Sequence, residues 1–147
     1  MLQFVIKPFK ELSLEELYTM LQLRTKVFVV EQNCVFQDMD DKDQKGIHVL
    51  AYHEGVLVAY SRLLAPGISY PQMSIGRVLT DTDRRKEGFG IDLMKQSVSS
   101  MYELYGKQPI RIGAQLYLKK FYESFGFIQT SEMYLEDDIP HIEMILE

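Results

Sequence analysis

The chain has 147 residues, 46% of them hydrophobic and 25% charged, which is typical of an ordinary globular protein and favours one domain over residues 1–147. The formal net charge of −5 argues against a general nucleic-acid binder, and no apolar run approaches the roughly 20 residues that cross a bilayer. Because the one cysteine, Cys34, forbids an internal disulfide and the first residues lack a signal-peptide pattern, we expect a cytoplasmic protein without nucleic-acid or membrane partners.

The N-terminal region predicts a short strand over 3–7 and then a helix. Ser13 and Glu16 fit a capping box, in which the hydroxyl and the carboxylate each accept a backbone N–H at the start of a helix. The following residues repeat at helical spacing, so we expect them to bury one apolar face. This predicted face consists of Leu14, Leu17, Tyr18, Leu21 and Phe28.

An irregular segment over 31–46 follows the helix and is rich in aspartate. It contains Asp38, Asp40, Asp41 and Asp43. The spacing does not fit a calcium loop, because Lys42 and Asp43 occupy positions that need an oxygen ligand and a glycine. The histidines also lack zinc-ligand spacing, so we expect no metal site. Two interpretations are open: a solvated loop, or a loop whose carboxylates recognise a cationic amine.

The rest of the chain alternates between strands and helices. Apolar runs over 47–52 and 56–64 predict a β-hairpin, and Met73–Thr80 predicts the next strand. A polar loop then leads to Gly88, which opens a helical pattern that Gly106 ends. The C-terminal part continues with a strand over 110–115, a short helix over 117–125 and closing strands over 127–134 and 141–146. This order predicts a mixed α/β sheet with helices on its faces.

The turn from Arg85 to Gly90 has the form R-x-x-G-x-G. The first N–H groups of a helix lack intrahelical partners, and glycines let a phosphate approach the backbone closely. A solvated turn is the alternative, but the position between a strand and a helix favours an anion site. The turn is neither a Walker A loop nor a dinucleotide fingerprint, because no Gly-Lys-Ser/Thr follows and Arg85 replaces the first glycine. We therefore expect a phosphorylated cofactor here.

Three further residues each allow two interpretations. Tyr122 could give a proton to a basic leaving group, although packing in the core is favoured when this residue is considered alone. Arg77 could form a structural salt bridge or meet an acidic group of a substrate. Cys34 is more easily explained as a packed or loop thiol than as a nucleophile.

Taken together, these blocks resemble the GNAT superfamily of acetyl-CoA-dependent N-acyltransferases. The R-x-x-G-x-G turn after a strand, followed about thirty residues later by a strand and a Y-x-x-x-G-F helix end, is that superfamily's pattern. The resemblance covers nearly the whole chain. An ElaA-type subgroup is indicated by the runs LRTKVFVVEQNCVFQDMDDKD, HVLAY, YSRLLAPG, IGRVLT, AQLYLKKFYESFGF and EDDIPHIEM. The resemblance implies a mixed, mostly antiparallel central sheet, splayed between parallel strands over 73–80 and 110–115, with helices on both faces.

The resemblance also implies roles for individual residues in binding acetyl-CoA. Backbone groups of Val78, Leu79 and Thr80 would meet the pantetheine arm and the thioester carbonyl. The pyrophosphate would be bound, mostly through main-chain N–H groups, by Arg85, Lys86, Glu87, Gly88, Phe89 and Gly90. Tyr122 would protonate the departing thiolate. Gln115 stands near the place where many members carry an asparagine, and is assigned to the cofactor with that departure noted.

The function that follows is transfer of an acetyl group to a primary amine, in a small molecule or a peptide, by direct attack in a ternary complex. Glu31 and His141 are the candidates for the base that deprotonates this amine. The segment 31–46 and the C-terminal hairpin should flank the acceptor, and a homodimer is compatible with base rates. The alternatives are a non-catalytic module that binds coenzyme A and a nucleotide-binding protein of another fold.

Overall fold

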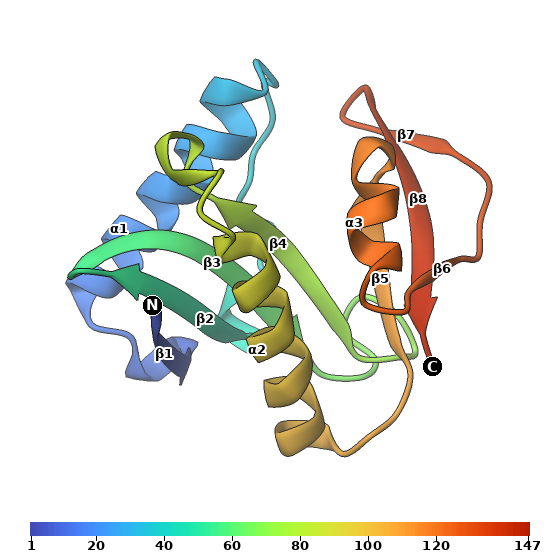
Figure 1. Cartoon of the computed structure of the whole chain (residues 1–147), viewed down its shortest axis with the longest axis horizontal. Helices are drawn as coiled ribbons and strands as arrows, with labels where there is room; N and C mark the ends of the chain where they lie inside the picture. Colours follow the sequence, from blue (N-terminus) through green and yellow to red (C-terminus); the bar gives the residue numbers. More distant parts are fainter.

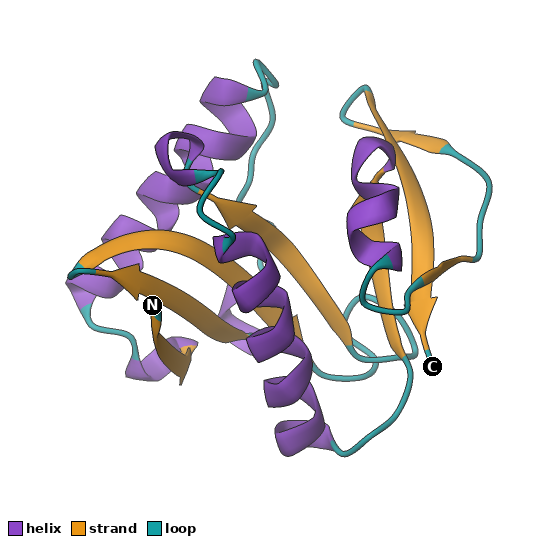
Figure 2. Ribbon diagram, in the orientation of Figure 1, coloured by secondary structure: helices purple, strands orange, loops and turns teal.

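The structure, a computed structural model, describes all 147 residues and contains two antiparallel sheets set side by side (Figures 1 and 2). The first sheet has the order β1-β2-β3-β4, and the second has β5-β8-β6 with β7 also paired to β8. The strands of the first sheet are β1 (Gln3–Pro8), β2 (Ile47–His53), β3 (Val56–Leu64) and β4 (Ser74–Thr80). The strands of the second are β5 (Ile110–Gln115), β6 (Ile128–Gln129), β7 (Tyr134–Glu136) and β8 (Ile139–Leu146).

The two sheets meet where β4 and β5 begin. A single parallel bridge joins Met73 to Ile110, and the N–H of Arg111 donates to the carbonyl of Met73 at 3.0 Å. No further ladder connects the two strands, so they diverge toward Thr80 and Gln115 (Figure 1). This confirms the predicted splayed sheet, and it leaves a wedge whose walls are β4 on one side and β5 on the other.

Helices cover both faces of the first sheet, as predicted. On β2, the side chains of Val49 and Ala51 belong to one apolar cluster together with α2 (Phe89–Tyr105). The side chain of Leu50 lies in a second cluster with residues of α1 (Leu14–Arg24). Since successive residues of a strand point to opposite faces, α1 and α2 pack on opposite sides of the sheet (Figure 2). None of the helices is both long and apolar enough to cross a membrane.

The start of α1 is confirmed, but its predicted buried face is wrong in part. Both hydrogen bonds of the capping box between Ser13 and Glu16 are present. However, the side chains of Leu14 and Tyr18 are exposed. The fully buried residues of the helix and of its π-helical continuation (Thr25–Glu31) are Met20, Leu23, Arg24 and Val27. The buried face is centred on Arg24, which is 0% exposed, and apolar spacing alone gives no sign of a buried charge.

The predicted strand over 127–134 is also wrong in part. Ile128–Gln129 pairs with β8, the ladder is then interrupted, and pairing with β8 resumes at Tyr134, where β7 begins. Between them, the hydroxyl of Ser131 accepts the backbone N–H of Glu143 at 2.9 Å, so a side chain takes the hydrogen bond that a ladder would use. The predicted helix over 117–125 is a 3₁₀ turn (Leu116–Leu118) followed by α3 (Lys119–Glu123). Further 3₁₀ turns cover Phe9–Glu11, Asp43–Lys45 and Thr82–Arg84.

Candidate active site

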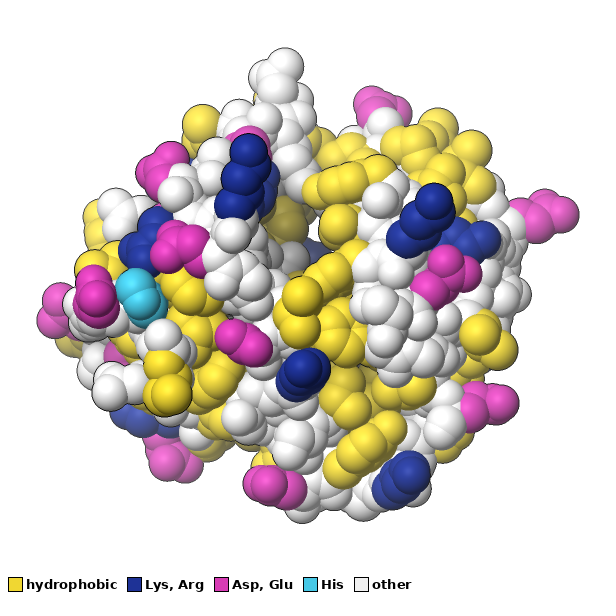
Figure 3. Space-filling view, viewed as in Figure 1, with side chains coloured by type: hydrophobic (Ala, Val, Ile, Leu, Met, Phe, Trp, Pro, Cys, Tyr) yellow, Lys and Arg dark blue, Asp and Glu magenta, His cyan; other side chains and the backbone are white.

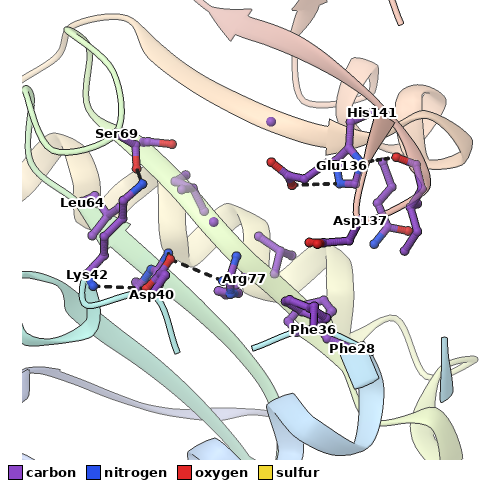
Figure 4. A pocket seen from close by; sticks show the side chains of 18 of the residues that line it. Phe28, Phe36, Asp40, Lys42, Leu64, Ser69, Arg77, Glu136, Asp137 and His141 are labelled. Carbon is purple, nitrogen blue, oxygen red and sulfur yellow. Dashed lines mark hydrogen bonds and ion pairs between the residues drawn. The ribbon is translucent and has the colours of Figure 1, made fainter. Parts of the chain in front are cut away.

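A cavity of about 500 Å³ occupies the wedge between β4 and β5. The space-filling view shows the surface hollowed between the α2 side and the α3 side (Figure 3). The cavity walls come from β4, from β5, from the segment between Phe28 and Lys42, and from the β7–β8 hairpin (Figure 4). The segment and the hairpin therefore flank the wedge, as the sequence predicts. Of the predicted site residues, the cavity brings together Val78, Gln115, Tyr122 and His141.

The wall formed by β4 carries a β-bulge. Tyr60 pairs with Leu79 and Arg62 pairs with Gly76, so Arg77 and Val78 together face the single residue between Tyr60 and Arg62. Arg77 has a φ of 50°, the left-handed conformation that a bulge of this kind requires. Neither Arg77 nor Val78 has a register partner in β3. The bulge thus exposes strand backbone to the cavity, where an N–H can donate to a ligand.

The turn before α2 presents a row of unused backbone donors. No N–H from Arg85 to Ile91 donates to another group of the protein. Gly88 caps the helix with a φ of 77°, and a Cβ added there would meet no atom within 4 Å, so the turn is open. Gly90, by contrast, lies close to the side chains of Phe121 and Thr80. Free N–H groups at a helix N-terminus, with the helix dipole behind them, form an anion-binding site.

Glu31 lies beside this turn and not in the cavity. Its carboxylate is ion-paired with Arg85, which donates to Oε1 at 2.6 Å, and Thr82 also donates to Oε1 at 3.1 Å. The hydrogen bond from Arg85 lowers the pKa of Glu31 below its usual value. A carboxylate that is already paired and less basic is a poor proton acceptor. The structure therefore does not bring Glu31 and His141 together.

Tyr122 lies on α3 at the inner end of the cavity. Its ring packs edge-on against Phe121 and Phe127, with ring centroids 5.2 and 6.0 Å away, and the residue is 6% exposed. The packing interpretation is thus correct for the ring. The hydroxyl, however, makes no hydrogen bond within the protein and the residue lines the cavity. Burial raises the pKa of Tyr122, so the phenol stays protonated and can act as a proton donor.

His141 reaches the cavity from β8, directly opposite Gln115 on β5. Its Nδ1 is 2.7 Å from the carbonyl oxygen of Ile139, which can only accept, so Nδ1 carries a proton. Its Nε2 lies 3.4 Å from Oε2 of Glu136. In the neutral imidazole Nε2 is therefore the atom with the free lone pair, which can accept a proton.

The aspartate-rich segment is not simply a solvated loop, and Asp40 and Lys42 in it line the cavity. Most of its carboxylates belong to an internal ion network. Arg24 binds Asp38 at 2.7 Å and Asp43 at 2.8 Å, and both aspartates are buried. Arg62 bridges Asp43 and Asp40 at 2.8 Å. Burial opposes ionisation of Asp40, yet the paired Arg62 guanidinium holds the pKa of Asp40 well below its usual range.

Arg77 belongs to the same network, which agrees with its salt-bridge interpretation. Its Nε is 2.8 Å from Oδ1 of Asp38, although the two atoms are not aligned for a hydrogen bond. Its terminal nitrogen donates to the backbone carbonyl of Asp38 at 2.8 Å and to Asp40 at 3.3 Å. The network thus fixes the segment across the bulge in β4 and shapes one wall of the cavity.

The remaining predicted residues lie on β4 or on the turn and first residues of α2. Leu79 packs its side chain into the core cluster around α1, so that only its backbone is available to a ligand. Phe89, the first residue of α2, is buried in the main apolar cluster, and Lys86 and Glu87 are exposed on the turn. Sequence reasoning missed Lys42, Ser69 and Glu136 as cavity residues. Each is an isolated polar residue in a loop or at a hairpin, and no spacing pattern distinguishes it.

The chain is similar to known proteins over nearly its whole length. A family model described as an acetyltransferase (GNAT) domain matches residues 10–147. The protein ElaA of Escherichia coli is 44% identical over 139 residues, which cover 93% of this chain and 91% of ElaA.

Solved structures give the same result. An acyl-CoA N-acyltransferase from Pseudomonas aeruginosa superposes with a TM-score of 0.93, 41% identity and full coverage of both chains. The crystal structure of E. coli ElaA also has a TM-score of 0.93, with 40% identity and full coverage of both chains. An aminoglycoside 6′-N-acetyltransferase complexed with coenzyme A shares the fold, with a TM-score of 0.69, 16% identity and coverage of 96% and 95%.

Proposed function

The chain belongs to the GNAT acetyltransferase family, and we propose that it transfers the acetyl group of acetyl-CoA to a primary amine. The observation that carries this proposal is the combination of two features on one wedge. Unused N–H groups from Arg85 to Ile91 lie at one end, and the unbonded phenol of Tyr122 lines the cavity. The first feature suits a diphosphate, and the second suits a leaving group that needs a proton.

The residues present fit acetyl-CoA as the donor substrate. The turn ending at Gly90 would bind the pyrophosphate through its backbone amides, with the guanidinium of Arg85 and the ammonium of Lys86 adding positive charge. The bulged stretch Val78–Thr80 would bind the pantetheine arm through its backbone. Gln115, on the opposite strand, would contact the cofactor from the second wall.

The chain's own groups can then perform each proton transfer. An amine must be neutral to attack a thioester, and Nε2 of His141 accepts its proton, helped by the carboxylate of Glu136. A backbone N–H at the bulge near Val78 stabilises the oxygen on which negative charge develops. The phenol of Tyr122 protonates the thiolate as it leaves. No covalent link to the enzyme is needed, because both substrates are held in one cavity.

Glu31 receives a different role from the one that its sequence position suggests. Its ion pair with Arg85 and its hydrogen bond from Thr82 support a role in positioning the cofactor turn. We therefore assign the base to His141 and keep Tyr122 as the acid.

The experiment that tests this function has a binding arm and a turnover arm. Acetyl-CoA should raise the melting temperature, because a ligand that binds only the folded state stabilises it, whereas ATP should not. Release of free thiol should then require both acetyl-CoA and an amine. A melting shift without thiol release for any amine would favour a non-catalytic module that binds coenzyme A. A shift with ATP alone would favour a nucleotide-binding protein.

A further inference from the structure

The two ends of the cavity differ in the sign of their unpaired charges, one end being positive and the other negative. The internal ion network contains Arg24, Arg62, Arg77, Asp38, Asp40 and Asp43. Its positive and negative charges are equal in number, so it contributes no net charge to the cavity. The charged side chains that remain on the cavity wall, outside this network, are Lys42, Glu136, Asp137 and, when protonated, His141.

Lys42 is the surplus cation at one end. Its backbone N–H is fixed by Oδ1 of Asp40 at 3.1 Å, and its Nζ donates to the hydroxyl of Ser69 at 2.9 Å. No carboxylate lies within ion-pair distance of Nζ, although the residue is half-buried. Figure 4 shows Lys42 and Ser69 together at one side of the cavity. An ammonium that is partly removed from water and lacks a counter-ion favours an anionic guest.

Glu136 and Asp137 are the surplus anions at the other end. The one ion-pair partner of Glu136 is the imidazole of His141, at 3.4 Å. The carboxylate of Asp137 makes no hydrogen bond or ion pair. Both project from the β7–β8 hairpin on the side of the cavity away from Lys42 (Figure 4). Carboxylates beside the proposed base attract an amine in its protonated form and hold it near His141.

The rest of the cavity wall mixes apolar and polar side chains. Leu64, Ile75 and Phe36 line it, and so do the ring of Phe28 and the side chain of Val78. The guanidinium of Arg77, which also lies between the ends, is already paired with Asp38. A guest that spans the cavity therefore meets a cation at one end, a mixed wall of apolar and polar side chains, and carboxylates with an imidazole at the other end.

We propose that the acceptor is an amino acid in the chemical sense, an amine that carries a carboxylate at the far end of a spacer. This inference rests on the proposed acetyl transfer and names its substrate class. Lys42 and Ser69 bind the carboxylate, and Glu136 and Asp137 hold the ammonium until His141 takes its proton. Diamines and polyamines are poor acceptors, because their second ammonium would lie against Lys42.

The test compares acceptors that differ only at the far end. A series of linear ω-amino acids of increasing length is offered with acetyl-CoA, each beside its amide and the diamine of equal length, and thiol release gives kcat/KM. We expect at least one length at which the acid exceeds its amide by about tenfold or more, as hydrogen bonds to charged groups usually imply. Equal values for acid, amide and diamine at every length would overturn the inference but leave acetyl transfer intact.

Variants of Lys42 make the test independent of spacer length. Lys42→Met should remove the advantage of the acid, Lys42→Arg should retain most of it, and Lys42→Glu should shift preference to the diamine. Lys45→Met is the matched control, since Lys45 is an exposed lysine close in sequence that does not line the cavity.

Each variant must keep the melting shift given by acetyl-CoA, which shows that it is folded and loaded. An equal loss with every acceptor in Lys42→Met would overturn the inference. Absence of thiol release with any amine in the unmodified protein would contradict the acetyl transfer itself, and the inference with it.

Discussion

The carboxylate of Glu31 is ion-paired with the guanidinium of Arg85, so a residue at the end of the first helical segment holds a residue of the anion-binding turn. The two are 54 positions apart in the chain. Both lie outside the cavity, whereas Tyr122 and His141 line it. This separation distinguishes a role in holding the turn from a role in proton transfer.

Glu31→Gln tests that distinction. Glutamine cannot form the ion pair that holds Arg85, so the turn should be held less firmly and acetyl-CoA should bind up to about fivefold more weakly, the scale of an exposed ion pair. The rate kcat should stay close to that of the unmodified protein. Calorimetry and steady-state kinetics measure the two quantities. A fall in kcat of a hundredfold or more, typical of losing a general base, would contradict our assignment.

His141→Gln should lower kcat by roughly 10²- to 10⁴-fold, because glutamine keeps hydrogen-bonding capacity but cannot accept the proton of the amine. Affinity for acetyl-CoA, measured by calorimetry, should be unchanged, since His141 is not part of the amide turn. His53→Gln is the control for loss of an imidazole outside the cavity, and only its kcat is compared, because His53 contacts Arg84 and Phe89 at the turn before α2. Equal losses in both variants would exclude a specific role for His141.

Tyr122→Phe should lower kcat while the dissociation constant for acetyl-CoA stays the same, because only the unbonded hydroxyl is removed from a well-packed ring. The pH profile gives a second readout. Burial raises the pKa of Tyr122, so the phenol remains protonated above its ordinary value of about 10. Turnover should therefore show no decline from this residue as the pH rises toward 10. A variant with normal kcat would show that Tyr122 is only a core residue.

Arg24→Met should be strongly destabilising, by about 3–5 kcal/mol in the free energy of unfolding. Arg24 is 0% exposed and is the partner of both Asp38 and Asp43, so its removal leaves buried carboxylates without their counter-charge. Urea unfolding followed by circular dichroism measures the change. The triple replacement Arg24→Met, Asp38→Asn, Asp43→Asn should recover part of the loss. If the single variant were as stable as the unmodified protein, the network would have no structural role.

Acid should destabilise the protein through the same network. The pKa of Asp40 is lower in the folded state than in the unfolded chain, in spite of burial, because Arg62 pairs with it. Its contribution to stability is therefore complete above the unfolded value, near pH 4, and is lost as the pH falls toward the folded value. Unfolding in urea at a series of pH values checks this. In Asp40→Asn, the pH dependence below about 4 should be weaker.

More of the fold than of the candidate site could be predicted from the sequence. Hydrophobic runs, the capping box at Ser13 and the glycines at positions 88 and 106 all mark local structure, and local structure follows from local residues. The resemblance then supplied the splayed sheet. By contrast, the buried face of α1 was misjudged, because Arg24 is stabilised by aspartates that lie 14 and 19 positions away.

The site shows the same limit more clearly. The amide turn is contiguous in sequence, so the R-x-x-G-x-G pattern indicates it. The cavity is not contiguous, because it joins Lys42, Tyr122 and Glu136 from distant segments. Glu31 and His141 were both chosen as candidate bases from residue type alone. Only the structure shows that one carboxylate is occupied by Arg85 and that the imidazole has a free nitrogen.

The bridge between Met73 and Ile110 is the point about which the two sheets can change their relative angle. Both residues are 0% exposed, and they form the only backbone pairing between the two sheets, at the narrow end of the gap. A small change in the angle between β4 and β5 at this bridge gives a larger displacement at Thr80 and Gln115, where the two strands end. Residues that touch no ligand can therefore set the width of the cavity opening. Substitutions at Met73 or Ile110 are a route to altering which acyl chains and amines enter the cavity.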